Sequence, residues 1–192
     1  MDSLESGQAR EHIEMVERIL AESSQRLCHG AEYFIVWGLY SAAATVGWQL
    51  IANGVLPVWS AWWQAGLLAA AIVFSIVRGR TKRAQELRRS LVQREFFNVL
   101  WLTMSLAFIA NVAAYKIFSG WASAAIWTFA EAIVLLYIGL HGNRRAQICG
   151  VLVVVSLVVA NFSAPSAAGY VLAAGMLAGY AGFGISELFA RD

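Results

Sequence analysis

The chain contains no charged residue between Arg145 and Glu187. A helix of about 20 apolar residues is long enough to cross the hydrocarbon core of a bilayer, and this stretch has room for two such helices. Residues 161–169, which include Asn, Ser, Pro and Gly, are expected to form the turn between them. The stretch therefore predicts a pair of membrane-spanning helices.

The composition extends this prediction to the whole chain. Of its 192 residues, 59% are hydrophobic and 14% are charged, whereas a soluble domain has about 25% charged residues. A chain of this length forms one compact unit by default. The composition therefore indicates a single integral membrane domain and argues against an ordinary soluble domain.

Six apolar runs are predicted to form helices that cross the bilayer as three hairpins. The fifth run is rich in β-branched residues, but a strand would leave its backbone unpaired in lipid, so a helix is expected there too. The predicted fold class is an all-α, polytopic membrane protein with additional short cytoplasmic amphipathic helices. The predicted spans are about 33–52, 58–77, 96–115, 121–140, 147–161 and 169–189, within a transmembrane domain of residues 33–192.

The distribution of basic residues predicts the orientation. Of the 14 Lys and Arg residues, all except Lys116 fall in the N-terminal segment, in residues 78–95, at 144–145 or at the C-terminus. The positive-inside rule then places both termini in the cytoplasm and the chain in the cell (inner) membrane as a multi-pass protein. Five tryptophans lie at the predicted non-cytoplasmic ends of the spans: Trp48, Trp59, Trp62, Trp63 and Trp121. They fit an interfacial belt or, alternatively, a cage for a cationic ligand.

Two segments outside the spans are predicted to form cytoplasmic amphipathic helices. Residues 1–32 carry seven acids and three arginines, and residues 78–95 carry seven bases and two acids. We expect the N-terminal helix to pack on a connector helix at 79–95, which Gly79 separates from the second span, although the basic connector could instead lie on anionic headgroups. Their apolar faces would dock each other or a partner protein through Ile13, Val16, Leu20, Leu27, Leu87 and Leu91.

Glu131 is the one ionisable residue near the middle of a predicted span. Inserting a charged residue at that depth costs about 2.5–3.5 kcal/mol, so it marks a functional candidate by default. No Lys or Arg lies at its depth, and desolvation without a cation favours the protonated acid. Such an acid suits a proton or cation site, and equally a hydrogen bond that joins two helices.

Several polar residues lie at depths close to that of Glu131. The candidate site combines Glu131 with Thr128, one helical turn before it, and with Asn111 and Ser105 of the third span. Other polar residues at neighbouring depths are Ser41, Thr45 and Ser156.

The sixth span contains small residues spaced by four, three and four positions: Gly175, Gly179, Gly182 and Ser186. On a continuous helix these residues would form one smooth face, which allows another helix to approach closely. That helix would belong to the same bundle or to a second copy of the chain, so a homo-oligomer is an open alternative.

The sequence lacks the usual motifs of catalysis. Asp occurs only at Asp2 and Asp192, and no Gly-x-Ser-x-Gly, His-Glu-x-x-His or phosphate-binding glycine loop is present. His141 ends the fourth span, where a cation stabilises the helix terminus, so metal or haem ligation is not expected. Cys28 and Cys149 are expected to be free thiols. We therefore expect no enzyme, no cofactor, no metal and no nucleic-acid partner.

Two function classes remain. In the first, a small non-enzymatic membrane protein binds or transports a proton, a cation or a small ligand through Glu131. In the second, a membrane-anchored interaction or regulatory protein docks a cytosolic or membrane partner through its cytoplasmic helices. The lipid bilayer surrounds the helical bundle in both.

Overall fold

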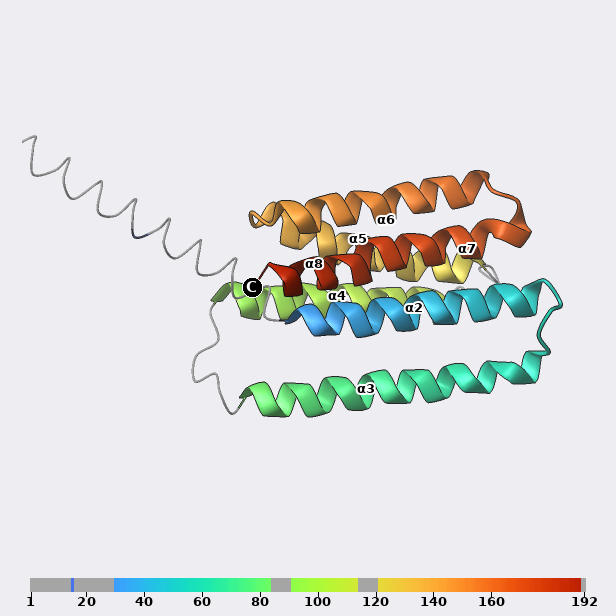
Figure 1. The fold of residues 1–192 in the computed structure, drawn as a ribbon, viewed down its shortest axis with the longest axis horizontal. Coiled ribbons are helices and arrows are strands. Elements are labelled where there is room, and N and C mark those ends of the chain that lie inside the picture. Colours follow the sequence, from blue (N-terminus) through green and yellow to red (C-terminus); the bar gives the residue numbers. More distant parts are fainter. Residues whose placement is uncertain (1–14, 16–29, 84–90, 114–120, 191–192) are drawn as a thin grey trace, which may run out of the picture.

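The structure, a computed structural model, describes residues 30–83, 91–113 and 121–190, together with Met15. Every regular element within these residues is a helix. Consecutive long helices run antiparallel along one common direction (Figure 1). The elements are α2 (Ala31–Ala52), the 3-10 helix η2 (Val58–Ala61), α3 (Trp62–Arg83), α4 (Leu91–Ala113), α5 (Trp121–Leu140), α6 (Arg144–Phe162), α7 (Pro165–Met176), the π-helical turn η3 (Leu177–Ala181) and α8 (Gly182–Phe189).

Five helices are long and apolar enough to cross a membrane, and the described chain is all-helical as predicted. These helices are Ala31–Ala52, Val58–Thr81, Ala122–Leu140, Arg144–Phe162 and Pro165–Phe189. The third predicted span, 96–115, matches a shorter apolar helix, Asn98–Ala113, and residues 114–120 lie outside the described part. A sixfold crossing of the bilayer therefore stays a prediction.

Local signals set the boundaries of α6 and α7. Gly142 has a φ of +96°, a conformation that glycine adopts without strain, and it ends the turn after α5. The next residue, Asn143, caps α6 because its side-chain oxygen accepts a hydrogen bond of 3.0 Å from the Ala146 backbone N–H. Pro165 opens α7, where a missing backbone N–H costs nothing. The last helical run therefore begins four residues earlier than the predicted span.

Gly79 does not separate α3 from a connector helix, so that prediction was wrong. The helix α3 continues through Gly79 to Arg83, and α4 begins at Leu91. A glycine inside a helix costs about 1 kcal/mol relative to alanine, which is too little to end a long helix by itself. The predicted packing of the N-terminal helix on the connector falls mostly on residues 1–14, 16–29 and 84–90, which lie outside the described residues.

Glycines permit the close helix contacts in the bundle. A β-carbon added at Gly38 of α2 would lie 2.6 Å from a backbone nitrogen of η3, and one at Gly184 of α8 would lie 2.5 Å from a backbone oxygen of α2. A β-carbon at Gly139 of α5 would lie 2.8 Å from the backbone of α6. Real β-carbons essentially never approach closer than 3.0 Å. These helix pairs therefore reach their separation only because the side chain is absent.

The run from α7 through α8 forms the centre of the bundle. Within its most apolar window 61% of the residues are buried, against 11% for the helix at Val58–Thr81. Phe34 of α2 packs against Tyr180 and Phe183, with ring centroids 5.0 and 4.9 Å apart. Val134 and Leu135 of α5, both 0% exposed, belong to the same core. The fourth and sixth predicted spans are thus the most enclosed elements.

The helix α3 lies at the edge of the bundle beside α2 (Figure 1). Two polar links join these helices: the Trp37 indole donates a 3.1 Å hydrogen bond to Ser75, and the Arg78 guanidinium donates two, of 2.6 and 2.9 Å, to the Glu32 carboxylate. Glu32 belongs to the acidic N-terminal segment and Arg78 to the basic one. One ion pair therefore joins the two segments whose opposite charge the sequence shows.

Candidate functional site

Glu131 lies midway along α5 and points into the bundle. Its side chain is 4% exposed, and its Oε2 atom is buried with no hydrogen-bond partner among the described residues. Leaving a buried polar atom unpaired costs about 1–3 kcal/mol, and more for a charged group. A buried oxygen of this kind needs an explanation, because native proteins pair most of them.

Hydroxyl groups from two other elements lie near the Glu131 carboxyl. Ser41 of α2 is its hydrogen-bonding neighbour, and Tyr180 of η3 is close enough to interact with its charge. A hydroxyl both donates and accepts hydrogen bonds, so it can serve the neutral acid as well as the carboxylate. The candidate site is therefore a junction of α2, α5 and η3.

The π-helical turn η3 forms one side of this junction. Its residues Leu177–Ala181 interrupt the long C-terminal helix, and Tyr180 and Ala181 are buried. Turns of this type are rare and occur frequently at functional sites. The turn brings the Tyr180 ring into the core next to Phe34 while its backbone packs on Gly38. The irregular turn therefore carries a side chain, Tyr180, that lies within electrostatic range of the buried acid.

The other predicted members of the site do not gather around the carboxyl. Thr128 is 0% exposed, but its hydroxyl donates a 2.9 Å hydrogen bond to the Ala124 carbonyl of its own helix. Ser105 is exposed on α4. The Asn111 amide donates a 3.1 Å hydrogen bond to the Ala107 carbonyl and accepts one from the Ser123 hydroxyl. These residues were predicted at depths similar to that of Glu131, but the polar groups of Thr128 and Asn111 bond elsewhere and Ser105 is exposed.

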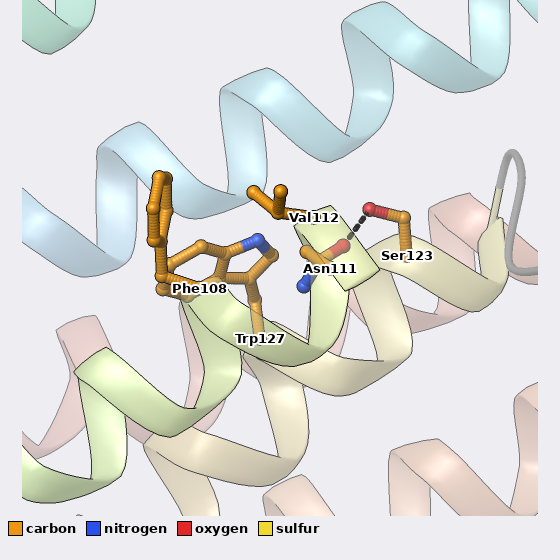
Figure 2. A pocket seen from close by; sticks show the side chains of 5 residues that line it. All are labelled: Phe108, Asn111, Val112, Ser123 and Trp127. Carbon is orange, nitrogen blue, oxygen red and sulfur yellow. Dashed lines mark hydrogen bonds between the residues drawn. The ribbon is translucent and has the colours of Figure 1, made fainter. Parts of the chain in front are cut away.

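Asn111 and Ser123 belong instead to an open pocket between the end of α4 and the start of α5. Its volume is about 540 Å³, and Figure 2 shows its lining side chains with the Asn111–Ser123 hydrogen bond. The Trp127 ring lies beside Phe108, with its indole nitrogen on the side of Val112. This pocket is one helical turn from Glu131 along α5, since Trp127 precedes Glu131 by four residues.

The predicted small-residue face is divided between different surroundings. Gly175 and Gly179 lie against α6, where added β-carbons would overlap Ser156 and Val153. Gly182 has only a carbonyl of its own helical run nearby, at 3.4 Å. The Ser186 hydroxyl donates to the Phe183 carbonyl at 2.8 Å. Of the four residues, Gly175 and Gly179 therefore pack on the same helix, α6, inside the bundle.

Two polar clusters at opposite ends of the bundle were not among the predicted sites. At one end, buried Gln49 of α2 donates a 3.1 Å hydrogen bond to the Pro165 carbonyl and accepts one of 2.9 Å from the Gly169 N–H. At the other end, buried Glu187 of α8 accepts a 3.1 Å hydrogen bond from the Asn143 amide. Each cluster fastens the C-terminal helical run to another part of the bundle.

Most of the predicted docking residues lie outside the part of the chain that the structure describes. Ile13, Val16, Leu20, Leu27 and Leu87 lie outside the described residues, and Leu91 is the first residue of α4. Within the described ranges, no group of three His, Cys, Asp or Glu residues is arranged to hold a metal ion.

Comparisons with models of protein families, with curated proteins and with solved structures find no match to this chain. The case for a functional site therefore rests on the junction around Glu131.

Proposed function

We propose that this chain is a small, non-enzymatic, multi-pass membrane protein that binds and exchanges a proton at Glu131. The observation that carries the proposal is the buried Oε2 atom, which finds no hydrogen-bond partner in the described part of the chain. A carboxyl oxygen left open in this way is available to a proton. Acidic side chains inside membrane helices commonly mark proton relays.

The surroundings favour a proton over a larger cargo. The Glu131 side chain is 4% exposed, and Thr128, Val134 and Leu135 on the same helix are 0% exposed. A metal cation would need several oxygen ligands around it, whereas Ser41 and Tyr180 each supply a single hydroxyl. A proton needs one lone pair and displaces no packed side chain.

The two hydroxyl groups give the proposal a local mechanism. When Glu131 is a carboxylate, the Ser41 hydroxyl donates to it; when Glu131 is protonated, the acid can donate to a hydroxyl oxygen. The π-helical turn carries Tyr180, so a change in the charge of Glu131 would act on the least regular part of the long C-terminal helix. We further propose six crossings with both termini in the cytoplasm, in keeping with the positions of the basic residues.

Infrared spectroscopy of the purified protein in lipid tests whether Glu131 exchanges its proton. The band of a protonated carboxylic acid should disappear as pH rises, and Glu131→Gln should lack this titrating band. Glu187→Gln is the matched control, because Glu187 is also a buried glutamate, 6% exposed, but lies at an end of the bundle. A Glu131 band that stays constant over the whole pH range would assign the acid to helix packing and refute the proposal.

Proton flux in proteoliposomes tests the transport part. With an imposed pH gradient and a potassium ionophore to balance charge, wild type and Glu187→Gln should acidify the vesicles faster than empty vesicles do. The rate for Glu131→Gln should be at least about tenfold lower, because the variant lacks the group that would relay the proton. Equal flux in Glu131→Gln and wild type would count against transport through this residue.

A further inference from the structure

The pocket between α4 and α5 combines an apolar wall with the indole N–H of Trp127, a hydrogen-bond donor without a partner among the described residues. Phe108 and Val112 of α4 are 59% and 62% exposed and form the open side. Asn111 and Ser123 hydrogen-bond to each other, and the Asn111 amide also donates to the backbone of α4. The Trp127 indole N–H, in contrast, has no acceptor within residues 30–83, 91–113 and 121–190. A ligand for this pocket should therefore be apolar and carry one acceptor oxygen.

The position of the pocket points to the class of ligand. Asn111 lies two residues before the end of α4 at Ala113, and Ser123 lies two residues after the start of α5 at Trp121. If these helices cross a bilayer, their ends lie at the boundary between hydrocarbon and headgroups. Helical side chains lean toward the N-terminus of their helix, so the Trp127 ring leans toward this same boundary. Lipid ester carbonyls are acceptors that occur at that depth.

We propose that this pocket binds one glycerolipid of the surrounding membrane. The upper part of an acyl chain lies against Phe108 and Val112, and an ester carbonyl accepts the hydrogen bond of the Trp127 indole. The pocket volume, about 540 Å³, is within the range of roughly 300–1,000 Å³ that is typical of ligand sites. Glu131 does not line this pocket, so the lipid proposal does not rest on the proton exchange proposed there.

Binding of a fluorescent ester phospholipid to the full-length protein in detergent micelles tests the proposal. Two competitors are compared: an unlabelled diester phospholipid and its diether analogue, which has the same chains and headgroup but no carbonyl. Wild type should prefer the diester by about 3- to 10-fold, which corresponds to one hydrogen bond. Trp127→Phe keeps the ring but removes the N–H, and it should lose this preference.

Two further variants separate the pocket from the general surface. Val112→Trp fills the pocket and should weaken lipid binding at least about tenfold. Trp101→Phe changes a 70% exposed tryptophan on the same helix and should leave affinity and ester preference unchanged. All variants are first shown to unfold at the wild-type temperature in the same detergent, and Val112→Leu is used in place of Val112→Trp if the bulkier variant does not fold. The proposal is overturned by an absent ester preference in wild type, by an unchanged preference in Trp127→Phe, or by a long-chain alcohol that competes as well as the diester.

Discussion

The Ser156 side chain of α6 occupies the space that a β-carbon on Gly175 of α7 would need. The two helices therefore touch through a hydroxyl on one and a bare backbone on the other. The Ser156 hydroxyl is itself fixed, because it donates a 2.7 Å hydrogen bond to the Val153 carbonyl. A side chain at position 175 has no room unless the helices move apart.

Gly175→Ala should destabilise the protein by about 1–3 kcal/mol, which is the usual cost of forcing extra atoms into a packed core. The measurement is equilibrium unfolding in mixed micelles, followed by circular dichroism. Gly182→Ala is the matched control, because its nearest neighbour lies at 3.4 Å. That variant should be neutral or slightly stabilising, since alanine favours helix. Equal loss in both variants would show that the contact with Ser156 does not decide the result, because helix propensity alone favours alanine at both positions.

Gln49→Leu should destabilise the protein by about 1–3 kcal/mol, because it leaves the polar groups at Pro165 and Gly169 without the partners that Gln49 provides. The residue is 4% exposed, so water cannot readily replace it. Asn53→Ala removes an exposed hydrogen bond of 3.0 Å to the Ser166 carbonyl and one of 2.9 Å accepted from Gln49, but it leaves the bonds of Gln49 to Pro165 and Gly169 in place and should cost less. Thermal unfolding in detergent compares the two. A larger loss for Asn53→Ala would contradict the role assigned to Gln49.

Reversing one partner of the Glu32–Arg78 pair should loosen α3, which has few other links to the bundle. Glu32→Arg or Arg78→Glu alone should lower the unfolding temperature, and the two together should restore most of it. The effect should shrink in high salt, since Arg78 is exposed and salt screens exposed charges. Proteolysis at the ends of α3 gives a second readout. A double variant no better than the worse single one would refute the pairing.

Cysteine labelling tests the predicted orientation. In a chain with Cys28 and Cys149 replaced by Ser, Asn53→Cys should react with a membrane-impermeant maleimide on intact cells. His141→Cys should react only after the cells are permeabilised, because the basic pair that follows it marks a cytoplasmic turn. Both positions are exposed, so access and not burial decides the labelling. The opposite pattern would invert the predicted topology.

Helix positions could be predicted from the sequence wherever the cause is local. Hydropathy alone places α5 at Trp121–Leu140, with the predicted bounds, and the Gly142–Asn143 pair marks the turn before α6. The burial of Glu131 also follows from its place in an apolar run. These features depend on the residue and its neighbours in sequence, which a single chain displays directly.

Helix rotations could not be predicted, because they depend on contacts between distant segments. Depth placed Ser41 near Glu131 as well as Asn111 and Ser105 and could not rank them, so the predicted site combined Glu131 with Asn111 and Ser105. The side chain beside Glu131 belongs instead to Ser41, 90 positions earlier in the chain. Gln49 gave no signal either, since a glutamine near a helix end is usually exposed. Its role follows only from the position of Gly169, far along the sequence.

The π-helical turn changes the phase of the last helix. One residue more per turn rotates everything after it by roughly 100° relative to an unbroken α-helix. Gly175 meets α6 before the turn, Gly179 meets α6 within it, and Gly184 meets α2 after it. The C-terminal helical run thereby presents differently oriented glycine faces to α6 and to α2. Deleting the exposed Ala178 would rotate Gly184 away from α2 while leaving Gly175, Gly179 and Gly184 in the chain.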